Sequence, residues 1–255
     1  IELPKVDLDK IIIDNSHIHN NVRESFISQQ KEWDENNPNS PFNLFGESDD
    51  NFIEFKRNAR KEVNYLVKEF ECKKSADAYA RAATARTGLL DTAKLHTYKF
   101  NEDLFKKVSV IPDGKNHGLV FVLDWSGSMS EVMLDTVKQL YNLLWFCKKV
   151  NIPFEVYAFT TSHPPMESNG YHELSHEREE GVALIEENFS MMNLFTSRVN
   201  VKELDEQMHN IYRIASAFNR DWYCPYNIPI GLSLSGTPLN EAIISLHQIL
   251  PQFKK

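Results

Sequence analysis

Three side chains that can supply oxygen ligands follow the apolar stretch GLVFVL. Asp124, Ser126 and Ser128 occupy alternate positions of the sequence DWSGS, and Gly127 between the serines is expected to let the loop turn tightly. One carboxylate and two hydroxyls are hard donors, which suit Mg²⁺ or Mn²⁺ in octahedral geometry better than zinc. The pattern therefore predicts a divalent cation site. The simpler alternative is that these side chains only cap the helix that begins near Glu131.

The elements around this loop are those of an α/β fold. Residues 118–124 read as a buried strand, 131–149 as an amphipathic helix and 153–160 as a second strand. A strand, a crossover helix and a strand in that order predict a parallel sheet, with further helices at 201–218 and from about Pro238. We expect a doubly wound, mostly parallel sheet, and ligands in such sheets bind at the carboxyl ends of the strands, where Asp124 lies.

A second piece of sequence gives the oxygen-rich loop a family resemblance. The D-x-S-x-S pattern and the later SGTPLNEAI, residues 235–243, together resemble the metal-ion-dependent adhesion site of von Willebrand factor type A domains. The resemblance implies Thr237 as a further metal ligand. Members of that family take a second acidic ligand from a T/S-D-G motif on the strand that follows. The present sequence reaches Lys255 before any such motif, so we expect the domain to lack its C-terminal strands. Trp125, a loop aromatic at a strand end, is expected to be exposed as an interface residue.

Residues 87–95, TGLLDTAKL, narrow the resemblance. They are similar to the G-x-L-D-x-x-x-L segment that precedes the same domain in CobT-type cobaltochelatase subunits; the alternative is an ordinary turn into an amphipathic helix. The resemblance implies a subunit with no catalysis of its own, partnered by an AAA+ ATPase of the MoxR or CobS type. An acidic residue of that ATPase would bind the metal. The complex of the two proteins would be compatible with a ring-shaped assembly.

The chain divides into three regions by composition. Residues 1–51 are polar and include an Asn/Ser/Pro/Asp-rich stretch, so we expect a partly disordered or extended segment. Residues 52–105 are expected to be a helical region, because apolar side chains recur at spacings of three and four. Residues 106–255 form the expected von Willebrand A-type domain.

Composition also limits the partners. The 255 residues carry 28 Lys+Arg against 36 Asp+Glu, a net charge of −8, which argues against binding to a phosphate backbone. No apolar run is long enough to span a membrane. The three cysteines lie far apart and favour a reducing, cytoplasmic location.

Two rival functions remain open from the sequence. His172, Glu173 and His176 match H-E-x-x-H, the zinc-binding motif of metallopeptidases, although they follow a turn-prone run and a solvated polar helix start explains them as well. The second rival is a stand-alone adhesion module that works without an ATPase.

Overall fold

The computed structural model describes residues 3–4, 6–81, 83–100, 104–110, 118–162, 185, 188–219 and 224–253. The HELSH sequence at 172–176 lies outside these ranges. Contacts divide the chain into two compact units. We call residues 1–63 with 117–255 the body, and residues 64–116 the arm.

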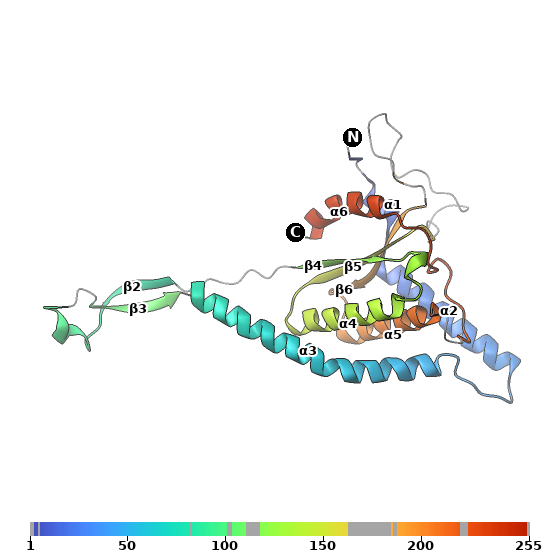
Figure 1. Cartoon of the computed structure of the whole chain (residues 1–255), viewed down its shortest axis with the longest axis horizontal. Coiled ribbons are helices and arrows are strands. Elements are labelled where there is room, and N and C mark those ends of the chain that lie inside the picture. The colour runs from blue at the N-terminus through green and yellow to red at the C-terminus, as the bar shows by residue number, and fades with distance from the viewer. Residues whose placement is uncertain are drawn as a thin grey trace. The chain divides into compact units, whose positions relative to one another are not determined.

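The body is built on a four-stranded sheet of order β1-β6-β5-β4 (Figure 1). Its strands are β1 Ile12–Ile13, β4 Leu119–Asp124, β5 Phe154–Thr160 and β6 Ser190–Thr196. β4 runs parallel to β5 and β1 parallel to β6, whereas β5 and β6 are antiparallel. The predicted mixed α/β class with a mostly parallel sheet is therefore confirmed, with the antiparallel pair and β1 as additions.

Helices cover both faces of the sheet. α4 Met133–Lys149 and α5 Val201–Ala217 lie on one face, and α1 Leu8–Ile11 and α6 Leu239–Phe253 lie on the other (Figure 1). α4 buries apolar side chains at helical spacing, namely Met133, Val137, Leu140 and Leu144. The predicted helices at 131–149, at 201–218 and after Pro238 are each confirmed to within two residues. Among the described helices, none has the length and apolar character needed to cross a membrane.

The N-terminal region differs from the expectation of a partly disordered or extended segment. Residues Asn15–Asn36 form the helix α2, and β1 just before it joins the sheet. The helix buries Ile18, Val22 and Phe26 at a spacing of four, while polar side chains occupy the positions between them. A low average hydrophobicity concealed this narrow apolar stripe, which packs into the main core.

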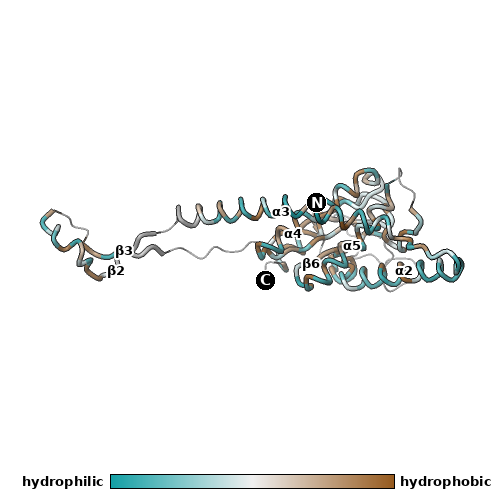
Figure 2. The backbone as a smooth tube through the Cα atoms, turned by 90° about the horizontal axis from the view of Figure 1, so that it is seen from below, coloured by the Kyte–Doolittle hydropathy of each residue, from teal (hydrophilic) through white to brown (hydrophobic). Residues whose placement is uncertain are grey.

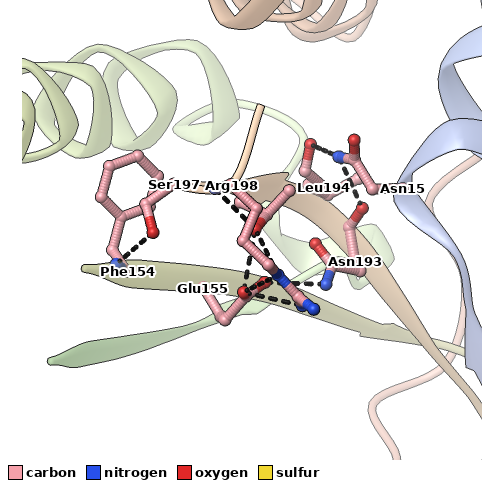
Figure 3. Close-up of polar contacts among 8 residues, drawn as sticks. Asn15, Phe154, Glu155, Asn193, Leu194, Ser197 and Arg198 are labelled. Carbon is pink, nitrogen blue, oxygen red and sulfur yellow. Dashed lines mark hydrogen bonds and ion pairs between the residues drawn. The ribbon is translucent and has the colours of Figure 1, made fainter. Parts of the chain in front are cut away.

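Polar side chains of α2 fix a bulge in β6. Phe195 and Asn193 pair with consecutive residues of β5, so the intervening Leu194 has no partner in β5. The Nδ2 of Asn15 donates to the carbonyl oxygens of Asn193 at 3.2 Å and of Leu194 at 3.0 Å (Figure 3), and the His19 Nε2 lies 2.7 Å from the Leu194 oxygen. The bulge thus finds its hydrogen-bond partners on α2, which places that helix against the strand.

A buried carboxylate lies on the other side of the same bulge. Glu155 on β5 accepts hydrogen bonds from Asn193 Nδ2 at 2.9 Å, Thr196 Oγ1 at 2.8 Å and Arg198 Nε at 3.0 Å (Figure 3). Its side chain is 5% exposed, whereas that of Arg198 is 75% exposed. The carboxylate is therefore satisfied by three donors around the bulge, which makes it a structural acid.

The arm differs from the predicted helical region at 52–105. α3 Gly46–Arg81 provides the expected helix, with Phe52, Ala59 and Val63 buried, but it is followed by an antiparallel hairpin of β2 Ala83–Leu90 and β3 Phe105–Val110. A short 3₁₀ turn, Leu95–Thr97, lies in the connection. Gly88, with φ of +74°, lies in β2 at the register shift between Arg86 and Leu90. The TGLLDTAKL segment therefore spans the end of β2 and the start of the connection.

Candidate metal centre

Asp124 ends β4, and one of its carboxylate oxygens has no partner among the described residues. The residue pairs with Phe159 of β5 at the carboxyl end of both parallel strands, as expected for a binding site in such a sheet. Its Oδ1 is buried and accepts no hydrogen bond from the residues that the structure describes. A buried carboxylate oxygen without a donor is unfavourable, and a bound cation is one way to satisfy it.

Ser126 and Ser128 follow Asp124 by two and four positions, and their hydroxyls lie close to each other. Ser126 is 1% exposed, and its Oγ lies 3.1 Å from the Oγ of Ser128. Neither serine caps α4, because the N-cap residue of that helix is Val132; Ser126 precedes the 3₁₀ turn Gly127–Met129 but makes no side-chain cap there. The capping alternative is therefore wrong for both serines, and their hydroxyls are turned toward each other.

The loop before α6 is bound to the Asp124 loop by its backbone. Gly127 N–H donates to the Ser235 carbonyl at 2.8 Å, and Ser235 N–H donates to the Trp125 carbonyl at 3.3 Å, which makes a short parallel bridge. Thr237 follows two residues later on the same loop and is exposed. The structure thus joins the two loops that the sequence singled out and leaves the Thr237 side chain accessible.

The end of β5 adds hydroxyls that the sequence analysis missed. The Ser235 Oγ lies 3.1 Å from Thr160 Oγ1 and 3.0 Å from Thr161 Oγ1, and it accepts a hydrogen bond from Thr161 N–H at 3.1 Å. Ser162 Oγ donates to the Ser233 carbonyl at 2.7 Å. The signal was present in the sequence, because TTS follows the apolar strand of β5 just as DWSGS follows β4.

The tight contact that favours glycine in this loop pair is at Gly236 and not at Gly127. Gly127 does not have positive φ, and a Cβ there would lie 3.7 Å from the Ser235 carbonyl, an ordinary contact. A Cβ on Gly236 would instead lie 3.0 Å from Thr161 Oγ1, which accepts the Gly236 N–H at 3.1 Å. Glycine at 236 therefore permits the close approach of β5 to the Thr237 loop, because a Cβ there would force the Thr161 side chain to shift by a few tenths of an ångström.

Trp125 is buried, so the expectation of an exposed interface residue is wrong. Its side chain is 0% exposed, its Nε1 donates to the Leu232 carbonyl at 2.9 Å, and its ring meets Phe218 edge-to-face at 5.7 Å. Alternation along the extended backbone places it on the core side of the loop. Trp125 therefore anchors the Asp124 loop to the segment before α6, and its side chain is not available to a partner.

The donor set is compatible with a hard divalent cation. No three or more His, Cys, Asp or Glu side chains gather within the described ranges, so a cation here would depend on hydroxyl oxygens and the single carboxylate of Asp124. The hydroxyls are neutral, so the single carboxylate compensates only half of the charge of a divalent ion. These donors fit Mg²⁺ or Mn²⁺ and are poorly suited to zinc.

Comparison with known proteins gave no match to a family model, to a curated protein or to a solved structure.

Proposed function

We propose that the chain is a metal-dependent protein-interaction subunit, with Asp124, Ser126, Ser128 and Thr237 holding Mg²⁺ or Mn²⁺. The observation that carries the proposal is the buried Asp124 Oδ1, which lacks a donor among the described residues. Two and four positions later, the hydroxyls of Ser126 and Ser128 lie 3.1 Å apart. Three hard donors within five residues at the end of a parallel strand favour such a cation. The resemblance to von Willebrand A domains adds Thr237, whose loop is hydrogen-bonded to the Asp124 loop.

The charge of the site favours an acidic ligand. Only one of the four proposed ligands is ionised, so a divalent cation retains net positive charge and an accessible coordination position attracts a further carboxylate. A carboxylate supplied by another protein would complete the coordination and gain a contact that does not exist without the ion. Association would then depend on metal.

The resemblance to CobT-type subunits supports an AAA+ ATPase of the MoxR or CobS type as the proposed source of that carboxylate. In this proposal the ATPase supplies the energy of a chelatase or remodelling complex, and the present chain supplies the recognition. Cys72, Cys147 and Cys224 are all free thiols, which is compatible with the proposed cytoplasmic location. A stand-alone adhesion module would use the same metal chemistry and differs only in its partner.

Metal binding is tested by thermal and urea unfolding with and without Mg²⁺. A ligand that binds only the folded state raises the free energy of unfolding by about 2.7 kcal/mol at a hundredfold excess over Kd. We expect this response in the wild type and expect Asp124→Asn, Ser126→Ala and Thr237→Ala to reduce it. Ser130→Ala, two positions beyond the proposed ligands, is the matched control. An equal response in all of these proteins would contradict the proposed site.

The partner is tested by pull-down of a MoxR- or CobS-type ATPase from the same organism. We expect capture in Mg²⁺, loss in chelator, and loss with Thr237→Ala. Metal binding without capture of the ATPase would leave the adhesion module as the better description. Undiminished capture in chelator would show that the ATPase contacts a different surface.

A further inference from the structure

One irregular segment of the body leads to the proposed ligand Thr237. Residues 224–237 form no helix and no strand, apart from the bridge at Ser235, and we call them the ligand segment. Its main chain is bonded mainly to side chains of other elements, as in the hydrogen bond from Trp125 Nε1 to the Leu232 carbonyl. The position of a segment without its own ladder of hydrogen bonds depends on the elements that hold it.

The start of the ligand segment is held by Gln29 of α2. The Asn227 N–H donates to Gln29 Oε1 at 2.7 Å, and Gln29 Nε2 donates to the Asn227 carbonyl at 3.0 Å. One side-chain amide thus pairs with both main-chain groups of a residue, as a neighbouring antiparallel strand would do. About two turns earlier on α2, Asn21 Nδ2 donates to the Ile230 carbonyl at 3.4 Å.

α2 can fix the ligand segment because the helix is itself fixed to the sheet. Its hydrophilic residues are interrupted by short hydrophobic stretches, which face the core (Figure 2). Asn15 in its first turn donates to the carbonyl oxygens of the β6 bulge. Tyr226, next to Asn227, is buried with its ring centroid 5.8 Å from that of Phe26 on α2. The amide contact at Asn227 is therefore part of a packed interface between α2 and the ligand segment.

The other end of the ligand segment meets the proposed metal site. Gly127 N–H donates to the Ser235 carbonyl at 2.8 Å, two residues before Thr237. A cation bound by Asp124 and Thr237 would join the same two loops and favour the same conformation of the ligand segment. Gln29 favours that conformation from the opposite end. Two contacts that stabilise one conformation are thermodynamically coupled.

We propose that Gln29 is a positioning residue of the metal site, coupled to the cation through the ligand segment and without contact to the ion. Thr237 is a ligand only if the proposed function holds, so the coupling rests on that function. Coupling is reciprocal. Loss of the amide contact weakens cation binding, and a bound cation protects the Asn227 N–H.

Titration of the full chain with Mn²⁺, followed by the paramagnetic resonance of the free ion, tests the first effect. We expect Gln29→Ala to raise the Kd for Mn²⁺ about fivefold or more. Gln30→Ala is the matched control, because the Gln30 amide accepts from the Leu44 N–H at 3.0 Å and donates to the Phe42 carbonyl at 2.9 Å, before α3. Both variants lose two hydrogen bonds to main chain and should lose similar stability, but Gln30→Ala should keep the wild-type Kd.

Amide hydrogen exchange tests the reciprocal effect and requires no variant. We expect Mg²⁺ to slow exchange of the Asn227 N–H in the wild type, although this residue lies ten positions before Thr237. The Leu44 N–H, held by Gln30, should exchange at the same rate with and without Mg²⁺. Gln29→Ala should abolish the effect of Mg²⁺ at Asn227. A purely structural role of Gln29 predicts no dependence on metal at this residue.

The wild type distinguishes the two ways in which the coupling can fail. If the wild type binds Mn²⁺ and Gln29→Ala binds it equally well, or if exchange at Asn227 does not respond to Mg²⁺, the metal site is independent of α2 while the proposed function stands. If the wild type binds no Mn²⁺, the proposed function is wrong and the coupling is wrong with it.

Discussion

Gly127 and Ser235 are joined by a main-chain hydrogen bond of 2.8 Å, from the Gly127 N–H to the Ser235 carbonyl. The backbone of Ser235 thereby holds the loop after β4, while its side chain holds the end of β5 through Thr160 and Thr161. One residue thus connects two strand ends with the loop that carries Thr237. The positions of the proposed ligands depend on this connection.

Ser235→Ala should weaken the metal response more than the fold. The substitution keeps the backbone bridge but leaves the Thr161 N–H and the hydroxyls of Thr160 and Thr161 without their common partner. We expect a loss of about 1–2 kcal/mol in the free energy of unfolding and a smaller stabilisation by Mg²⁺. Urea unfolding with and without Mg²⁺ measures both effects.

Ser233→Ala is the control for this prediction, since Ser233 is exposed on the same loop and contributes its backbone carbonyl to Ser162. It should change neither quantity appreciably. If Ser235→Ala retained the full Mg²⁺ response, the hydroxyl cluster at the end of β5 would have no part in positioning the site.

The sequence predicted the helices and strands correctly where the periodicity of apolar residues is strong. β4 and β5 are apolar runs, and α4, α5 and α6 follow patterns of three and four, so burial specified both their type and their order. The D-x-S-x-S loop was placed correctly because ligands in parallel sheets collect at carboxyl ends. The approach of Ser235 to Gly127 agrees with the expected pairing of the two loops.

The remaining features depend on tertiary contacts that no local pattern encodes. β6, SMMNLFT, is buried along its whole length without alternation, and its antiparallel pairing includes a bulge whose partners lie on α2, far away in sequence. Trp125 packs against Phe218 and donates its indole N–H to Leu232, and both partners lie far away in the sequence. α2 was missed because its apolar stripe is narrow.

Asp49 connects α3 to α5 by ion pairs and should make the body sensitive to acid. Its carboxylate accepts from Arg213 Nε at 2.7 Å and Nη2 at 2.8 Å, and His209 Nε2 lies 2.8 Å from Oδ1. Burial alone would raise the pKa of Asp49, but the contacts with His209 and Arg213 outweigh it and hold the pKa below 3.8. The carboxylate therefore contributes stability in full above about pH 4 and loses it as the pH falls through its lowered pKa.

Asp49→Asn should accordingly cost about 1–3 kcal/mol at pH 7, and the difference from wild type should shrink below pH 4. Chemical unfolding at pH 7, 5, 4 and 3 measures the difference. Asp50→Asn, at the exposed neighbouring position, should be close to wild type throughout. A constant difference between Asp49→Asn and wild type down to pH 3 would exclude the ion pairs as its cause.

Glu155 and Arg198 should contribute unequally to their shared ion pair. Glu155→Ala leaves the buried donors of Asn193 and Thr196 without an acceptor, and we expect a loss of about 2–4 kcal/mol. Arg198→Ala should cost less than about 1 kcal/mol. The arginine side chain is 75% exposed and lies at the edge of the cluster, so water can take over its hydrogen bonds to Glu155. Equal losses in urea unfolding would mean that the charge pair, and not the bulge, dominates.

His19 should make the free energy of unfolding depend on pH between about 4 and 6.5. Burial lowers the pKa of His19 from 6.5 to about 4, so the imidazole is neutral at pH 7 and its Nε2–H donates to the Leu194 carbonyl. As the pH falls through this window the unfolded chain takes up a proton that the folded chain does not, which disfavours folding. The loss should reach about 3 kcal/mol at pH 4, from 1.36 kcal/mol per pKa unit.

His19→Gln, which retains a donor for Leu194, should be less stable at pH 7 but should lack most of this slope. His247→Gln, at an exposed position on α6, should keep it. The charge of Arg23 lowers the pKa of His19, and the charge of Glu206 raises it. Arg23→Gln should therefore move the pH at which stability is lost upward, and Glu206→Gln should move it downward. A wild-type slope that survives His19→Gln would assign the acid sensitivity to another group.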